Sequence, residues 1–468
     1  MTRHKVALFV WLMAVAVYAV AVAGRTSFGI AGLTAIDRFT IDAATLSLFT
    51  IVQVGVYAGA QIPVGLLLDR LGPRILLSGG ALILAVGQLG MAWADSLGLA
   101  LAARFFIGLG DATAFTSVIR IIPSWFSPRR APLFTQLTGI VGGLGQFISS
   151  VPFAYVLANV GWTPAFAALA VFGLGVSALA FVFVRDTPSQ WTYSTIDVPD
   201  AATPADSAAR QGKQEIEARP DGATRSREVP HVAGRDGVES ASISQLVRDP
   251  EVWLGFWTHW LGNFPQTVFL LLWGVPFLQI HQEMSQAQAS ALLLVVTIAG
   301  MVFGPVIGEL TARHSKRRVW LVNAIAIMLA TTWTAVLLAP APAPMWLIIA
   351  LLIVLAASGP ASSIGFDFAR TAAPARRLGM ATGLVNMGGF TAALLTAGAI
   401  GVVLDRSSGG APLDAGDFKL ALATQAIPWL FGMFMLDRCR RKARLRDAKR
   451  GIVVAPVRDV LERYAVRR

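Results

Sequence analysis

Cysteine, histidine and charged residues are all scarce in this chain of 468 residues. The single cysteine, Cys439, cannot form an internal disulfide, and five histidines with one cysteine are too few to predict a metal centre. Charged residues make up 14% of the sequence, whereas soluble domains carry about 25%. This low charge, together with a hydrophobic content of 55%, indicates that lipid surrounds most of the chain.

Two motifs that would supply chemistry are also missing. The sequence contains no G-x-x-x-x-G-K-[ST] loop, so it predicts no ATP-driven transport. It contains no H-E-x-x-H motif either, so it predicts no metalloprotease site. We therefore expect a protein that is not an enzyme and that needs no cofactor. Its energy is expected to come from an ion gradient or from the gradient of its own substrate.

Long apolar runs are present in number. A helix needs about 20 apolar residues to cross a bilayer. The sequence has six runs of that length on each side of a polar stretch. We predict an all-α membrane protein with twelve transmembrane helices in two pseudo-symmetric six-helix halves. The expected spans are 7–30, 43–67, 75–94, 97–120, 132–157 and 163–184, then 251–278, 287–311, 319–339, 345–366, 378–404 and 418–437.

Positive charge is in excess, with a formal net charge of +12, and its placement is uneven. A basic chain can bind nucleic acid, but no basic face with interleaved aromatic residues occurs, so we expect no nucleic-acid partner. Arg and Lys gather instead in alternate loops, as at 129–130 and 313–318, and the opposite loops hold few. The positive-inside rule then predicts a multi-pass protein of the bacterial inner membrane with both termini cytoplasmic.

The stretch 186–250 is rich in Ala, Pro, Ser, Asp, Glu and Arg and poor in aromatic residues. Such a composition cannot bury enough apolar surface to fold. We predict a disordered cytoplasmic linker over 186–250 that joins a first half, 1–185, to a second half, 251–437. The basic stretch 438–468 is expected to be a cytoplasmic tail that lies on anionic lipid.

The two halves contain related segments. Gly65–Arg74 (GLLLDRLGPR) follows the second span and Gly308–Arg317 (GELTARHSKR) follows the eighth, with a Gly, an Arg and the final Arg at matching positions. The pair Thr138-Gly139 recurs as Thr382-Gly383 at nearly the same offset. These matches favour duplicated six-helix halves, an architecture of transporters that bind substrate between the halves.

The segment Gly65–Arg74 contains the full pattern G-x-x-x-D-R-x-G-x-R. It resembles the loop signature between the second and third helices of the major facilitator superfamily. The resemblance implies that Asp69 meets the start of the eleventh span in one conformation, where the helix dipole favours a carboxylate. The second copy has Ala312 in place of the aspartate, so a latch is expected on one side only. The expected gating residues are Gly65, Asp69, Arg70, Gly72, Arg74, Arg376 and Arg377.

The fourth span carries two charges, Arg104 and Asp111. Charges at this depth are costly and usually face a cavity or a partner. Seven residues apart on a helix, they share a face at a separation of about 10 Å, too far for a direct pair but suited to lining one aqueous path. The run resembles the R-x-x-x-G signature of the superfamily's fourth helix. Asp111 is similar to the acid of the organic anion:cation symporter branch, which takes up a proton with substrate; an interhelical salt bridge is the alternative.

The first span contains Arg25, with Tyr18 two turns before it. This pattern resembles the first helix of organic-anion transporters, in which an arginine binds the anionic group of the substrate through bidentate hydrogen bonds. The alternative is an arginine that snorkels to headgroups at the outer interface. The expected substrate-binding residues are Tyr18, Arg25, Gln53, Tyr57, Arg104, His259, Asn263 and Asn386, with Asp111 as the proton-coupling residue and no metal ligand.

Three functions are consistent with these features. Proton-coupled uptake of a small organic anion by alternating access is the leading prediction, because two intramembrane arginines favour an anionic substrate. A drug:proton antiporter is the second, and a non-transporting membrane sensor is the third. The expected partners are a small-molecule substrate, protons and the lipid bilayer, and the chain is expected to act as a monomer.

Overall fold

The computed structural model describes residues 3–41, 43–190, 243–409, 411–449 and 451. The regular elements in this part of the chain are all helices. The first set comprises α1 (Arg3–Phe39), α2 (Ala43–Trp93), α3 (Leu97–Trp125), α4 (Ala131–Ile148), η1 (Ser149–Phe153), α5 (Ala154–Asn159), α6 (Trp162–Phe183) and η2 (Pro188–Gln190). The second set comprises α8 (Ile243–Arg248), α9 (Pro250–Val268), η4 (Phe269–Trp273), α10 (Gly274–Ile280), α11 (Gln286–Arg313), η5 (Ser315–Arg317), α12 (Arg318–Leu338), α13 (Met345–Ala372), η6 (Ala375–Arg377), α14 (Leu378–Ser408), α15 (Ala415–Ala423) and α16 (Ala426–Lys449).

Eleven of the described helical stretches are apolar and long enough to cross a membrane. One of them, Leu48–Trp93, has 46 residues, more than twice the length of about 20 that a single crossing needs. Its helical backbone is interrupted at Gly72, so its two arms account for two crossings. The described chain therefore has a helix for each of the twelve predicted spans, and the all-α membrane fold is confirmed.

The interruption of α2 reverses the direction of the chain. Gly72 leaves the helical region with φ 78° and ψ 163°, a conformation that would strain a residue with a side chain. Arg38, which precedes α2, donates two hydrogen bonds to the carbonyl oxygen of Ala94, which follows it. Both termini of α2 therefore lie at one end of the bundle and Gly72 lies at the other.

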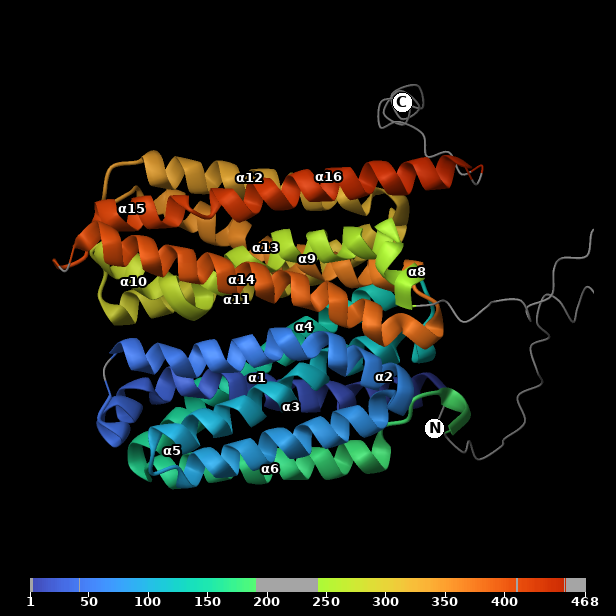
Figure 1. Ribbon diagram of the computed structural model, residues 1–468, viewed down its shortest axis with the longest axis horizontal. Coiled ribbons are helices and arrows are strands. Elements are labelled where there is room, and N and C mark those ends of the chain that lie inside the picture. The colour runs from blue at the N-terminus through green and yellow to red at the C-terminus, as the bar shows by residue number, and fades with distance from the viewer. Residues whose placement is uncertain (1–2, 42, 191–242, 410, 450, 452–468) are drawn as a thin grey trace, which may run out of the picture.

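The helices form two bodies that lie one above the other in Figure 1. We call α1 to α6 the first half and α9 to α16 the second half. The halves meet where α2 packs against α14 and where α4 packs against α11. Within the second half, α9 contacts α13, α14 and α16, and buried apolar side chains fill the space between them.

Both seams between the halves are close-packed around a glycine. A Cβ atom on Gly65 would lie 2.7 Å from the carbonyl oxygen of Gly379 in α14. On the other seam, a Cβ atom on Gly308 would lie 3.2 Å from the Cα atom of Leu133 in α4. Gly65 and Gly308 are the first residues of the two repeated segments, so equivalent positions in the repeats make equivalent contacts. We call the end of the bundle at which Gly65 meets α14 the latch end.

Large apolar side chains cover much of the outside of the bundle. Phe105, Phe181, Ile298 and Trp346 are among the exposed ones. An apolar surface of this kind suits lipid, because the backbone polar groups inside a helix bond to one another and only side chains meet hydrocarbon.

The structure differs from the predicted linker at both ends. Pro188–Gln190 and Ile243–Arg248 are helical, and Leu246 is buried, which anchors the second of these segments. The rest of the predicted linker, 191–242, lies outside the described residues.

The predicted start of the tail at residue 438 also differs from the structure. Helix α16 continues to Lys449, and within this extension Arg446 pairs with Asp249 and Glu251 at 2.7 and 2.8 Å. These contacts fix the extension against the start of α9. The remainder of the predicted tail, except residue 451, lies outside the described residues.

Candidate functional site

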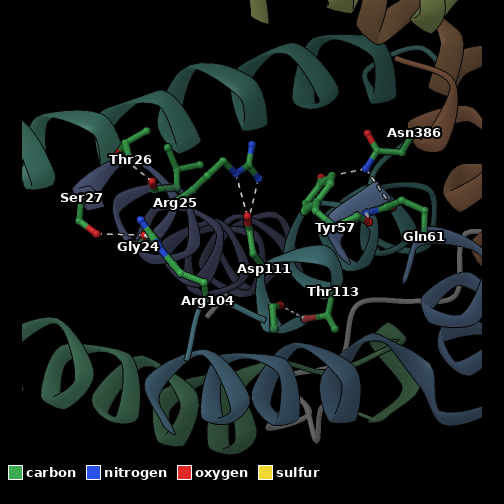
Figure 2. A network of polar contacts seen from close by, with 12 residues as sticks. Gly24, Arg25, Thr26, Ser27, Tyr57, Gln61, Arg104, Asp111, Thr113 and Asn386 are labelled. Atoms are coloured by element: carbon green, nitrogen blue, oxygen red, sulfur yellow. Dashed lines mark hydrogen bonds and ion pairs between the residues drawn. The ribbon is translucent and has the colours of Figure 1, made fainter. Parts of the chain in front are cut away.

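A buried ion pair joins α1 to α3. Arg25 Nε donates to Asp111 Oδ2 at 2.7 Å, and Arg25 Nη2 donates to Asp111 Oδ1 at 2.8 Å (Figure 2). The side chain of Asp111 is fully buried and that of Arg25 is 15% exposed. Removing one partner of a buried pair leaves an uncompensated charge and costs about 3–5 kcal/mol. The pair therefore fixes the position of both side chains.

Two aromatic rings contact the guanidinium of Arg25. Its central carbon lies 4.7 Å from the ring centroid of Tyr57 on α2 and 5.6 Å from that of Phe390 on α14. Such cation–π contacts favour a positive charge at this place. Because Phe390 belongs to the second half, the cation of the first half contacts both halves. Nε and Nη2 are engaged with Asp111, which leaves Nη1 as the nitrogen not used by that carboxylate.

A polar network continues from Tyr57 into the second half. Asn386 Nδ2 donates to Tyr57 Oη at 2.9 Å and to Gln61 Oε1 at 2.9 Å (Figure 2). Gln61 Nε2 in turn donates to the carbonyl oxygen of Tyr57 at 3.1 Å. All three residues are buried. Each hydrogen bond contributes about 0.5–1.5 kcal/mol to stability, and removing one partner would leave the other as a buried polar group without a hydrogen bond, which costs more.

A cavity of about 300 Å³ lies between the halves beside this network. This volume is at the lower end of the range of roughly 300–1,000 Å³ for small-ligand sites. Arg25 is the permanent charge among its described lining residues, and Asp111 lies behind Arg25 outside the lining. The polar lining residues come from both halves: Tyr18, Arg25, Thr26, Tyr57, Gln136, Gln146, His259, Asn263, Gln266, Thr267, Thr297, Ser362, Ser363 and Asn386.

The wall supplied by the second half offers hydrogen-bonding groups. His259 Nδ1 lies 3.3 Å from the carbonyl oxygen of Ser362. Asn263 Nδ2 has no hydrogen-bond partner among the described residues. A buried amide donor without a protein partner is unusual, and at a cavity wall it is available to a ligand oxygen.

Six of the eight predicted substrate-binding residues line this cavity together: Tyr18, Arg25, Tyr57, His259, Asn263 and Asn386. Asp111, the predicted proton-coupling residue, does not line the cavity. Its carboxylate is in an interhelical salt bridge, the alternative role, but its partner is the cavity residue Arg25. Arg25 is not an interfacial snorkelling residue, because it is held inside the bundle by that pair.

Arg104 does not line the cavity, so its predicted substrate contact is not supported by the geometry. Its Nη1 donates to the carbonyl oxygen of Gly24 at 3.3 Å, and its guanidinium lies 4.2 Å from the ring centroid of Phe28. The residue is 1% exposed. The spacing of Arg104 and Asp111 does place them on one face of α3, but Arg104 lies against α1 away from the cavity (Figure 2).

Gln53 is also absent from the lining. Its side chain is 3% exposed, and its backbone packs against α3 so closely that a Cβ atom on Gly108 would lie 2.7 Å from the Gln53 carbonyl oxygen. The glutamine therefore belongs to the α2–α3 packing.

Other lining residues, among them Gln146 and Phe390, were not predicted from the sequence. One signal was available for both. They are separated by the same 244 residues that relate Thr138 to Thr382 in the two repeats. Extending the alignment of the two repeats beyond the Thr-Gly pairs would have placed them at equivalent positions in the two halves.

At the latch end, Asp69 bonds to the first turn of α14. Its Oδ1 accepts from Gly379 N at 2.7 Å and its Oδ2 from Met380 N at 2.9 Å. The positive charges of Arg120 and Arg377 also act on this carboxylate. Arg120 Nη2 donates across the halves to the carbonyl oxygen of Ala375 at 2.8 Å. These contacts hold the latch end closed.

The other predicted gating residues have more local positions. Arg74 donates from its backbone N–H to Asp186 and from Nε to the carbonyl oxygen of Phe181, so it holds the turn against α6. Arg70 and Arg376 are exposed at the latch end. Gly72 supplies the reversal of α2.

The chain resembles known membrane transporters in sequence. Residues 14–397 match the family model described as Major Facilitator Superfamily. The chain is 26% identical over 189 residues to the probable sulfoacetate transporter SauU of Cupriavidus necator, covering 40% of this chain and 43% of that protein. It is 30% identical over 130 residues to the probable galactarate/D-glucarate transporter GudP of Pseudomonas putida, covering 26% and 28%. The matched segments thus span less than half of these relatives.

Solved structures extend the likeness to the whole fold. The proton:xylose symporter XylE matches with a TM-score of 0.63 at 14% identity, covering 92% of this chain and 96% of that chain. The family match also covers most of the chain, including most of both halves and the segment Gly65–Arg74. The chain therefore belongs to the major facilitator superfamily, as the loop signature predicted, and the relatives named above are transporters, not enzymes.

Proposed function

We propose that this transporter takes up a small organic anion together with a proton by alternating access. The observation that carries the proposal is the pair of Arg25 and Asp111, of which only Arg25 lines the cavity. A cation at the wall suits an anionic substrate, and an acid that neutralises the same cation suits a coupling group. Two of the relatives are named as transporters of organic anions, one of sulfoacetate and one of galactarate or D-glucarate.

The coupling follows from competition for Arg25. While Asp111 is charged, it holds Nε and Nη2 of the guanidinium and reduces the attraction of Arg25 for a second anion. When a proton binds the Asp111 carboxyl, the pair weakens and Arg25 turns its charge toward the substrate. Release of the substrate on the other side lets Arg25 recapture Asp111, and the proton leaves. Anion and proton therefore bind with positive cooperativity.

The other polar lining residues indicate which groups the substrate carries besides its anionic group. Asn263 and His259 face the cavity from the second half, opposite the cation of the first half. A substrate with an anionic group at one end and hydroxyl or carbonyl oxygens at the other satisfies both walls. The cavity volume of about 300 Å³ restricts it to a small molecule.

We assign the latch end to the cytoplasm. Arg129, Arg130 and Lys316 lie between long helices at this end, while Arg38 lies at the opposite end. This is the distribution of the positive-inside rule. With the latch end closed, the cavity is then in its outward-facing state, ready to accept substrate from outside. We propose that the protein lies in the bacterial inner membrane with both termini cytoplasmic and that it acts as a monomer.

The alternatives are weaker. A drug:proton antiporter would carry lipophilic cations, which Arg25 at the cavity wall disfavours. A sensor without transport would not need a coupling acid beside its ligand site.

Uptake into proteoliposomes tests the proposal. Sulfoacetate, galactarate and D-glucarate are the first probes, with an inward proton gradient as the driving force. We expect at least one probe to accumulate, and Asp111→Asn to abolish accumulation driven by the gradient while exchange of substrate across the membrane continues. Arg25→Gln should abolish both. Gradient-driven uptake that is unchanged in Asp111→Asn would contradict the coupling role, and uptake that is unchanged in Arg25→Gln would contradict the anion site.

A further inference from the structure

A second cavity, of about 280 Å³, lies at the latch end of the second half, where α9, α12, α13 and α16 converge. It shares no described lining residue with the cavity between the halves. Four cations line it: Lys316, Arg318, Arg440 and Arg444. The transport mechanism proposed above uses none of them.

Arg318 is the buried member of this group. The residue is 6% exposed, and its Nη1 donates to the backbone carbonyl oxygen of Asp367 at 3.2 Å. The carboxylate of Asp367 is bound instead by Arg370 at 2.7 Å. Arg318 Nε has no hydrogen-bond partner among the described residues. A guanidinium taken out of water normally receives an anionic partner. Among the described residues, the hydrogen bonds of this one go to a carbonyl and a hydroxyl oxygen, and the acids Asp367 and Glu251 act on it by charge alone.

The surrounding charges leave the cavity positive. Of the two acids in the lining, Glu251 is already bound by Arg446 at 2.8 Å, and Arg446 is not part of the lining. Asp447 is the second acid. The described lining therefore has four cations and two acids, and Arg446 already neutralises one of the acids, Glu251. The cavity as a whole attracts anions.

Two further features select the kind of anion. Arg440 is held in place, because its guanidinium lies 4.6 Å from the ring centroid of Trp320. Helix α12 begins at Arg318 with no side-chain cap, so backbone N–H groups of its first turn are not satisfied by a cap. Arginines at fixed positions next to a helix N-terminus match the charge and the several oxygens of a phosphate group.

We propose that this second cavity binds a phosphate group, held by Arg318 and Arg440 with Lys316 beside them. The group has two possible sources, the headgroup of an anionic phospholipid or a free phosphate or phosphate ester. The site is separate from the cavity between the halves, so the proposal stands whether or not the transported substrate is an organic anion.

The test measures thermal unfolding of the full-length protein in detergent. One arm compares sodium phosphate with sodium chloride at equal ionic strength, and the other compares mixed micelles of phosphatidylglycerol with micelles of phosphatidylcholine. A ligand that binds only the folded state raises the midpoint of unfolding. We expect a rise of several degrees with phosphate, with phosphatidylglycerol or with both. We expect none with chloride or with phosphatidylcholine, because choline neutralises the phosphate of that headgroup. A rise with both means that the phosphate group suffices, and a rise with phosphatidylglycerol alone means that the source is lipid.

Variants connect the rise to the site. Arg440→Gln removes one cation from the cavity rim and should reduce the rise at least severalfold, and Arg318→Gln should abolish it. The control is Arg441→Gln, on the same helix, whose exposed side chain pairs with Asp437 outside the cavity; it should keep the full rise. Should Arg318→Gln not fold, Arg440→Gln and Arg441→Gln still decide. The proposal is overturned if neither phosphate nor phosphatidylglycerol raises the midpoint, or if Arg440→Gln and Arg441→Gln respond alike.

Discussion

Asp69 and Gly379 belong to different halves, yet the carboxylate of Asp69 accepts a hydrogen bond from the backbone N–H of Gly379 at 2.7 Å. The carboxylate therefore acts as a cap for α14 supplied by another helix, and the dipole of α14 adds to the attraction. A single substitution can weaken this contact without changing the packing around it.

Asp69→Asn should shift the protein toward opening of the latch end. Loss of the charged cap costs about 1 kcal/mol, which changes the ratio of closed to open states about fivefold. Spin labels at Arg70→Cys and Arg376→Cys, both exposed, report the separation of the halves once Cys439 is replaced by serine. We expect longer distances to gain population. The control is Asp95→Asn in an exposed loop at the opposite end, and an unchanged distance distribution in Asp69→Asn would refute the latch.

Gly65→Ala should separate the seam between α2 and α14. The added Cβ atom would lie 2.7 Å from the Gly379 carbonyl oxygen and 2.8 Å from the Met380 Cα atom, which are backbone atoms that cannot rotate away. Overpacking of this kind costs about 1–3 kcal/mol. Gly59→Ala is the matched control on the same arm of α2, because no atom lies within 4 Å of its Cβ position. Thermal unfolding should show a lower midpoint for Gly65→Ala and an equal or higher one for Gly59→Ala.

Substitutions at Arg25 and Asp111 should be strongly coupled. Arg25→Gln leaves the fully buried Asp111 without its partner and should cost about 3–5 kcal/mol. The double variant Arg25→Gln/Asp111→Asn replaces the ion pair with two neutral amides and should regain much of that stability while remaining inactive in transport. Chemical unfolding of the four proteins gives the coupling energy, and additive losses would show that the pair contributes nothing as a pair.

Stability should fall in mild acid through His281, which follows the crossing formed by α9, η4 and α10. Burial lowers the pKa of His281 to about 4, and the charge of Lys419 acts in the same direction. An unfolded histidine titrates at about 6.5, so between these values the unfolded state binds more protons and the free energy of unfolding decreases as the pH falls. The temperature midpoint of unfolding should therefore decrease as the pH falls from 7 to 5. His281→Asn should flatten this decrease, whereas replacing the exposed His314 should leave it unchanged.

The sequence predicted the parts of this protein that depend on short stretches of chain. Apolar length alone located every span, and the pattern over Gly65–Arg74 indicated the family and the partner of Asp69. Both signals survive because they are local: a crossing needs a minimum length, and a turn with a charged cap needs its residues in a fixed order.

The pairing inside the bundle could not be read in the same way. Arg25 and Asp111 are 86 residues apart and lie on different helices, so their contact depends on how α1 and α3 are rotated about their axes. The same rotation turns Arg104 toward the Gly24 carbonyl oxygen instead of the cavity. Spacing along α3 gave the shared face of Arg104 and Asp111 but not what that face meets.

The replacement of the aspartate by Ala312 in the second repeat makes the two seams mechanically unequal. The α2–α14 seam resists separation at the latch end, because Asp69 must give up two hydrogen bonds before the helices can part. At the α4–α11 seam, Gly308 packs against Leu133, and the equivalent residue Ala312 has no carboxylate to bond across the seam. The two repeats therefore contribute unequally to the opening of the latch end, although their glycines pack alike.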